Sequence, residues 1–191
     1  MRRIFYFGIF AVAILGCSSS EGDRSSGKKS ERGKEDGSVV RFGDLRSAPP
    51  ASWEKEKPKS SMRAYQFRVP RAKGDEEDAE LLVFDSFRGS AEDNINRWKT
   101  KEFEPAEGKK IDDVSKVTKL DIAGRPAYYL DVSGTYLGGP GMGPTRKPGY
   151  RMLAVHYEGA DGKTYHIILR GPAKTVAEHK KEFDDWLAGF K

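Results

Sequence analysis

Apolar and polar residues alternate along several short stretches of the chain, the pattern of strands with one buried face. In MRAYQFRV at 62–69, the alternation places Tyr65, Phe67 and Val69 on one face and Gln66 on the other. The same reasoning predicts five further strands, at 81–87, 117–122, 127–136, 150–157 and 165–169.

Two other stretches repeat apolar residues at helical spacing. Ser90 with Asp93 three residues later resembles a capping box and predicts a helix to about Phe103. Thr175 with Glu178 predicts a second helix in the same way. The apolar stripe of this second helix consists of Val176, Phe183, Trp186, Leu187 and Phe190. The fold class that follows is α+β, a sandwich of about six mostly antiparallel strands packed by at least two helices.

A tight turn sets the pairing of the last two strands. If Ala160, Asp161 and Gly162 form the loop, with Gly162 in the left-handed conformation, the register of the two flanking strands follows. The numbers of any two residues that lie opposite each other then add up to 322. His156 then lies opposite His166.

The amino-terminal residues have a different pattern. Ile4 to Leu15 form an uncharged apolar run after two arginines, too short for a membrane span and typical of a signal peptide. The next residues complete Ile14-Leu15-Gly16-Cys17, which resembles the bacterial lipobox. That resemblance implies cleavage before Cys17 and a lipid thioether on its sulfur. Residues 1–16 are therefore expected to be a lipoprotein signal peptide.

The segment after Cys17 has no aliphatic or aromatic side chain from residue 18 to 38. Such a composition cannot bury enough apolar surface to offset the entropy of ordering, which predicts a disordered tether over 17–50 and one folded domain over 51–191. Cys17 is the only cysteine, so it cannot form a disulfide within the chain. With Ser18 after it, the lipoprotein resemblance implies the outer membrane rather than the inner one.

The charge of the chain changes this picture little. The formal net charge is +5, but residues 51–191 hold 25 basic and 23 acidic side chains. A mixed surface of this kind, on an exported protein, argues against a nucleic-acid partner.

The order of these signals is similar to that of a known family. Trp53 at the opening, a strand ending at Pro70, the AELLVF strand, a helix containing Trp98, two hairpins and the closing RGPAKTVAEHKKEFDDWLAGF resemble the PsbP-like fold. They also resemble uncharacterised bacterial lipoproteins that share this order. The resemblance implies a fold for residues 53–191 and carries no catalytic residues with it.

Candidate chemistry is sparse. His156 and His166, if they lie opposite each other, could hold a metal, but a catalytic zinc site usually needs a third ligand, which Glu158 or Asp131 would have to supply. The alternative is two polar side chains on a solvated sheet face. No His-Glu-x-x-His, Gly-x-Ser-x-Gly or phosphate-binding motif is present, and no cofactor is implied.

The loop at 137–149 is long and rich in glycine and proline, and long loops in compact domains are often functional. Its Met142, Arg146 and Lys147 are candidate residues for gripping a partner. The alternative is a solvent loop that simply tolerates insertion. The sequence thus favours a non-enzymatic, lipid-anchored binding or accessory protein of the cell envelope, attached to the membrane through Cys17 and acting on an envelope partner. A metal-dependent enzyme or metal-binding protein using His156 and His166 is one alternative, and a small-ligand carrier is another.

Overall fold

The computed structural model describes residues 39–85, 88–139, 143 and 145–191. The chain divides into two compact units, Met1–Lys34 and Glu35–Lys191, and every described residue belongs to the second. Cys17, the expected signal peptide and residues 17–38 of the expected tether lie outside the described residues. Within the described part, no helix is long and apolar enough to cross a membrane.

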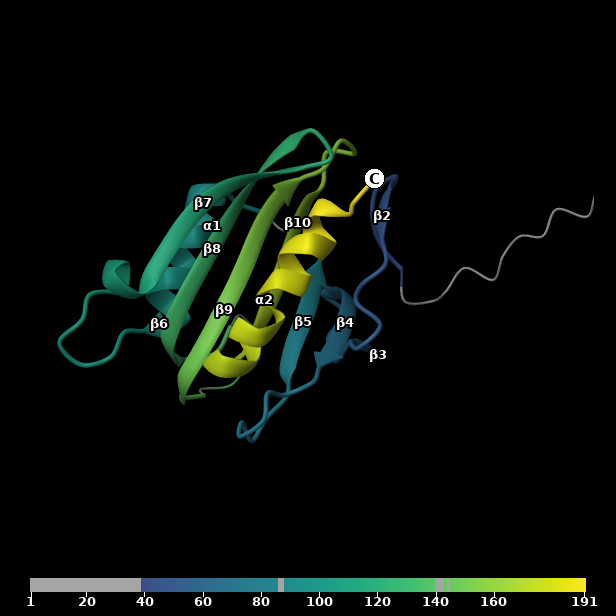
Figure 1. The fold of residues 1–191 in the computed structure, drawn as a ribbon. Helices are drawn as coiled ribbons and strands as arrows, with labels where there is room; N and C mark the ends of the chain where they lie inside the picture. The colour runs from purple at the N-terminus through teal and green to yellow at the C-terminus, as the bar shows by residue number, and fades with distance from the viewer. Residues whose placement is uncertain (1–38, 86–87, 140–142, 144) are drawn as a thin grey trace, which may run out of the picture. The chain divides into compact units, whose positions relative to one another are not determined.

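An eight-stranded sheet, antiparallel in every pairing, forms the centre of the domain (Figure 1). Its order is β3-β4-β5-β10-β9-β8-β6, and β7 pairs with β8 beside β6. The strands are β3 (Glu54–Glu56), β4 (Arg63–Val69), β5 (Ala79–Phe84), β6 (Phe103–Glu104), β7 (Ser115–Ile122), β8 (Arg125–Tyr136), β9 (Lys147–Glu158) and β10 (Thr164–Pro172). The sequence predicts only about six of them, because β3 and β6 are too short to show a period.

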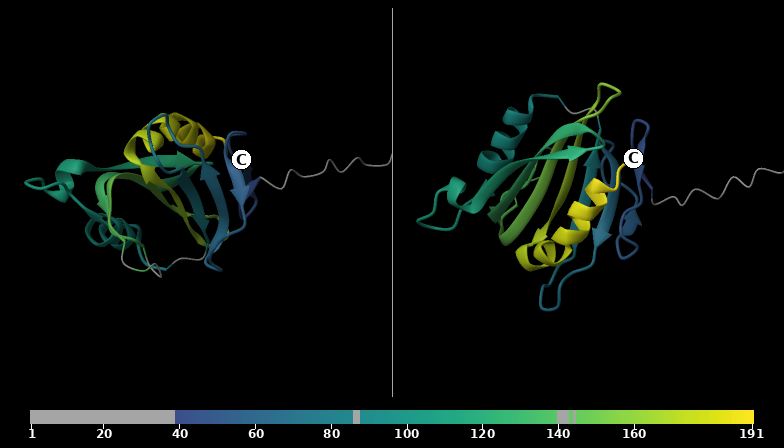
Figure 2. Two further views of the ribbon diagram at one scale, coloured as in Figure 1. Left: turned by 90° about the horizontal axis from the view of Figure 1, so that it is seen from below. Right: turned by 45° about the horizontal axis from the view of Figure 1, so that its top comes forward.

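Two helices cover opposite faces of the sheet, which confirms the α+β class (Figure 2). Helix α2 (Ala173–Ala188) lies on one face over the larger core, which contains Phe67, Leu153 and Ile167. Helix α1 (Ala91–Lys101) lies on the other face over a smaller core around Trp98. Since each sheet face has its own helix, strands in the middle of the sheet are buried on both sides.

Helix α1 begins as the sequence predicts. The hydroxyl of Ser90 accepts a hydrogen bond from the amide of Asp93, and the Asp93 carboxylate accepts one from the Ser90 amide. The helix then buries Ile95 and Trp98 against the sheet.

Helix α2 begins differently from the prediction. Its first residue is Ala173 after Pro172, so Thr175 is not its N-cap and no capping box forms with Glu178. The amide and hydroxyl of Thr175 instead donate to the carboxylate of Asp75, at 2.9 and 2.5 Å. A carboxylate from a distant turn therefore binds a free amide of the first turn, where an anion is favoured.

The predicted tether extends too far along the chain. Residues 40–50, which the prediction places in the tether, belong to the folded domain. Strands β1 (Val40–Phe42) and β2 (Leu45–Ser47) form a hairpin whose Val40 and Phe42 are buried. The ring of Phe42 stacks on Phe190 at 4.3 Å between centroids, and Arg46 exchanges two main-chain hydrogen bonds with Lys191. A few apolar side chains next to a long polar segment give too weak a signal to be recognised before the core that receives them is known.

A short η1 turn (Ile111–Val114) precedes β7, which returns into β8 through Ala123 and Gly124 at positive φ. The last hairpin has the predicted register, with His156 paired to His166 and Gly162 at φ 75°. Gln66 is wrongly predicted on a solvated face, because it is fully buried and donates to Glu56 while accepting from Arg63.

Candidate functional site

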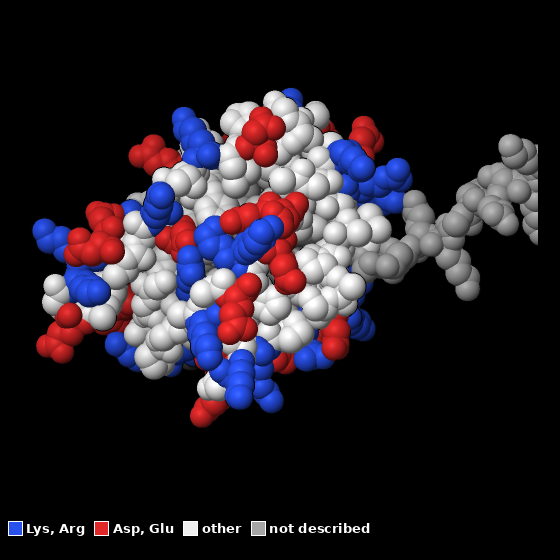
Figure 3. All heavy atoms as spheres, viewed as in Figure 1, with Lys and Arg blue, Asp and Glu red and all other residues white. Residues whose placement is uncertain are grey.

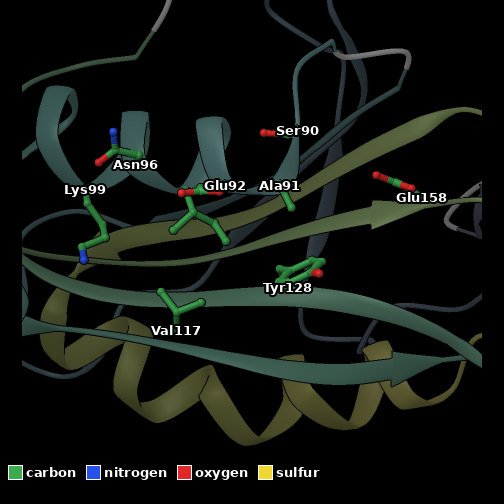
Figure 4. Close-up of a pocket in the computed structure, with 9 residues that line it drawn as sticks. Ser90, Ala91, Glu92, Asn96, Lys99, Val117, Tyr128 and Glu158 are labelled. Atoms are coloured by element: carbon green, nitrogen blue, oxygen red, sulfur yellow. The ribbon is translucent and has the colours of Figure 1, made fainter.

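A groove of about 630 Å³ runs between helix α1 and strands β7 and β8 (Figure 4). Helix α1 forms one wall through residues from Ala91 to Lys99, and the opposite wall comes from Val117 of β7, Tyr128 of β8 and Glu158 of β9. The residues that line it are Ser90, Ala91, Glu92, Ile95, Asn96, Lys99, Val117, Tyr128 and Glu158. This volume lies within the range of small-molecule pockets, roughly 300–1,000 Å³.

The sequence explains the walls of the groove. The Ser90 cap fixes where α1 starts, and Ala91, Ile95 and Lys99 then follow at intervals of four, so they share the lower side of the helix. From the sheet, Tyr128 and Val117 point up toward them (Figure 4). Val117 is one of two large apolar side chains that are exposed in the described structure, at 44%.

Charged side chains line the groove beside the apolar ones. Lys99 pairs with Asp112, and the ammonium of Lys119 lies 5.4 Å from the ring centroid of Tyr128. Glu92 and Glu158 contribute carboxylates. The groove therefore offers apolar and aromatic contacts together with both signs of charge.

The two predicted metal ligands adjoin this groove but are not open to it. His156 and His166 lie on the α1 face, each 1% exposed, with 3.1 Å between Nδ1 of His156 and Nε2 of His166. The ring of His166 meets the ring of Trp98 edge-on at 4.9 Å between centroids. The solvated face expected for these two residues is therefore wrong, because α1 covers it.

Burial shifts both histidines in the same direction. It lowers the pKa of His156, against the opposing effect of Glu158, whose carboxylate is 3.6 Å from Nε2 of His156. Burial, then His156 and Arg97, lower the pKa of His166 to about 3. Both imidazoles are thus neutral at pH 7.

The candidate third metal ligands are engaged elsewhere or exposed. Asp131 forms a bidentate pair with Arg151, at 2.8 and 2.6 Å. Glu158 has a side chain that is 72% exposed and lines the groove. Among the described residues, no group of three histidine, cysteine, aspartate or glutamate side chains is arranged to hold a metal ion.

A buried charged cluster lies elsewhere on the α1 face, and sequence reasoning missed it. Arg170 on β10 is 7% exposed and contacts the hydroxyl of Tyr136 and the carboxylate of Glu80. Nearby, Glu102 pairs with Arg97, yet burial outweighs that pairing and raises the pKa of Glu102 to about 7. These residues come from four separate elements, so no local motif could indicate them.

The loop residues predicted to grip a partner are only partly described. Met142 lies outside the described residues. Arg146 pairs with Glu104 at 2.6 Å, and Lys147 begins β9 and contacts Glu77. Both cations thus already have partners within the domain.

The visible surface carries both signs of charge. In Figure 3, basic and acidic side chains interleave over the face that contains α2. Lys180 with Asp184 and Lys181 with Asp185 form pairs one turn apart on this helix. This face therefore has no basic stripe.

Comparisons with known proteins yield structural neighbours only. No family model and no curated protein sequence matches the chain. Among solved structures, the cyanobacterial PsbP (CyanoP) of Synechocystis sp. PCC 6803 is 16% identical, with a TM-score of 0.46 over 83% of this chain and 95% of that one. A protein of unknown function from Pseudomonas aeruginosa is 13% identical, with a TM-score of 0.44 over 78% and 92%. At these values neither neighbour assigns a function to this chain.

Proposed function

We propose that this chain is a lipid-anchored protein of the cell envelope, held at the outer rather than the inner membrane through Cys17, whose folded unit binds a partner without catalysing a reaction. The groove beneath α1 is the observation that carries the binding role. It combines accessible apolar side chains with polar and charged ones, as recognition sites do.

The state of the polar side chains supports a non-enzymatic role. His156 and His166 bond to each other and are buried beneath α1, so neither can reach a substrate in the groove. A general base must come within hydrogen-bond reach of the proton it removes. Asp131 is likewise held by Arg151.

The anchor is supported by the sequence alone, through Cys17 and the apolar run before it. Lipidation is tested by growing cells with labelled palmitate and comparing the wild type with Cys17→Ala. We expect label and outer-membrane fractionation in the wild type, and loss of both in the variant. A wild-type chain that takes up no label would reject the anchor.

The binding role is tested separately, with full-length lipidated protein in mild detergent as bait. Ala91→Trp places an indole in the groove, at a half-buried first-turn position of α1 that lines it. The triple variant Met142→Ala, Arg146→Ala, Lys147→Ala tests the predicted loop contact. We expect an envelope partner captured by the wild type and the loop variant and lost from Ala91→Trp. Loss from the loop variant alone would move the contact to residues 137–149.

A small-ligand carrier is the second candidate, and the volume of the same groove favours it. It predicts that an apolar compound, and not a protein, co-purifies with the wild type and is missing from Ala91→Trp. Mass spectrometry of an organic extract of the purified protein separates the two functions.

A further inference from the structure

Among the described strands, the eight-residue β7 is an edge strand that pairs on one side only. Its inner side pairs with β8 from Ser115 to Ile122, and no described strand pairs with its outer side. In Figure 1 β7 lies at the margin of the sheet. A row of unpaired amide and carbonyl groups is a template for one more strand.

A hollow lies beside β7 on each face of the sheet. The groove under α1 includes Val117 on one face. On the other face, a second groove of about 280 Å³ lies between β7 and α2 and is lined by Thr118 and Leu120. Because side chains alternate along a strand, a segment added to β7 would direct successive side chains toward these two grooves in turn.

The charge of the strand indicates what kind of segment fits. Lys116 and Lys119 are both exposed, on opposite faces of β7. Among the described residues, no carboxylate forms an ion pair with either of them. Two edge lysines oppose pairing with a second copy of the same strand, and they complement an acidic one.

Resting on the binding role proposed above, we propose that β7 receives an extended acidic segment of a partner protein as an added antiparallel strand, with carboxylates beside Lys116 and Lys119 and apolar side chains beside Val117 and Leu120. The main-chain hydrogen bonds would supply affinity and the two grooves would supply specificity, as in other cases of strand addition.

The probe is a peptide written from this register, acetyl-Thr-Ile-Glu-Thr-Val-Glu-Thr-amide. Run antiparallel to β7, it places its glutamates opposite Lys119 and Lys116 and its isoleucine opposite Leu120. We expect a dissociation constant below about 1 mM by NMR titration. We also expect intermolecular Overhauser contacts to β7 and slower hydrogen exchange at the alternate β7 amides that point away from β8.

A charge exchange tests the register. Lys116→Glu with Lys119→Glu should weaken the peptide about tenfold or more. A second peptide with lysine in place of both glutamates should bind this variant and not the wild type. The matched control is Lys57→Glu with Lys163→Glu, the same charge change at exposed positions away from β7, which should leave the affinity unchanged.

Three results would overturn the added strand. The first is a titration that saturates without Overhauser contacts between the peptide and β7. The second is a control variant that weakens peptide binding as much as the β7 variant does, and the third is no binding at 1 mM peptide. The groove-blocking test with Ala91→Trp keeps the two proposals apart. If an envelope partner is lost from Ala91→Trp but is insensitive to the lysine exchange, the binding role stands and the β7 proposal fails. If the wild type captures no partner and binds no peptide, both fail.

Discussion

His156 and His166 face each other across β9 and β10 at hydrogen-bond distance, in a place that excludes water. With 3.1 Å between Nδ1 of one ring and Nε2 of the other, only one of these two nitrogens can carry the proton they share. Both side chains are 1% exposed. Burial therefore favours the state in which both rings are neutral, as the lowered pKa of each histidine indicates.

This pair predicts a loss of stability in mild acid. The folded pKa of His166 is lowered to about 3, whereas the unfolded chain binds its proton near pH 6.5. The contribution is therefore fully present above pH 6.5 and is lost as the pH falls below it, by about 1.4 kcal/mol per pH unit. The measurement is urea unfolding at several pH values between 7 and 5.

The control is His166→Gln, whose amide can still bond with His156 and does not titrate. We expect its free energy of unfolding to fall less steeply with decreasing pH than that of the wild type. The two slopes should differ by close to the value for one proton, about 1.4 kcal/mol per pH unit. Identical slopes in the two proteins would show that His166 is already protonated in the fold.

Glu102 should act in the opposite direction. Its pKa is raised to about 7 by burial, so the folded protein takes up this proton near neutrality and the unfolded chain only near pH 4.5. This carboxyl therefore adds stability as the pH falls from 7 and costs stability above it. Glu102→Gln should raise the free energy of unfolding at pH 8 relative to pH 5, by about 1 kcal/mol or more. The check is the difference between wild type and variant at the two pH values.

Asp75 should stabilise α2 about as much as an N-cap residue stabilises a helix. Asp75→Ala leaves the amide and hydroxyl of Thr175 without their acceptor, and we expect a loss of about 0.5–2 kcal/mol in unfolding free energy. Asp75→Asn keeps an acceptor oxygen and should recover part of the loss. Glu76→Ala, an exposed neighbour, should change little. Equal effects of Glu76→Ala and Asp75→Ala would mean that Asp75 acts only through general charge.

Phe42 should behave as a core residue although it lies in the segment that the sequence predicts to be a tether. It is 2% exposed and stacks on Phe190, so Phe42→Ala should destabilise the domain by about 3–5 kcal/mol in chemical unfolding. Asp44→Ala, in the exposed turn of the same hairpin, should cost little. A stability equal to the wild type in Phe42→Ala would return residues 39–50 to the linker.

Metal ions should have no effect on the fold. Since His156 and His166 are buried and bonded to each other, and Asp131 is bound to Arg151, we expect the same Tm after dialysis against a chelator and after addition of equimolar zinc. A rise in Tm with zinc that disappears in His156→Ala would revive the metal site.

The sequence is informative where structure is local. The Ser90 cap, the stripe on α2 and the pairing of His156 with His166 each depend on spacings of a few residues, and each is confirmed. Alternation along a strand says which residues share a face, and His166, Ile168 and Arg170 do so. The alternation does not say whether that face is exposed to solvent, because the helix that covers it comes from far along the chain.

For the same reason the candidate site is less predictable than the fold. The groove exists because α1 crosses over β7 and β8, and neither element shows this alone. The contacts of Arg170 with Glu80 and of Thr175 with Asp75 join residues about ninety to one hundred positions apart. Polar and charged residues that bind such distant partners have the same local sequence pattern as ordinary surface residues.

The β1–β2 hairpin also determines how the fold meets mechanical load. Any tension on the chain ahead of residue 39 enters at β1, which pairs with β2 and not with the eight-stranded sheet. The hairpin is held to the domain by the ring stack of Phe42 on Phe190 and by the two main-chain bonds between Arg46 and Lys191. The Ser47 hydroxyl also donates to the main-chain carbonyl of Trp186, and the Gly43 amide donates to the hydroxyl of Tyr165. A load that enters at β1 is therefore passed mainly to the carboxyl-terminal end of the chain, and not directly to the ladder of β8 and β9.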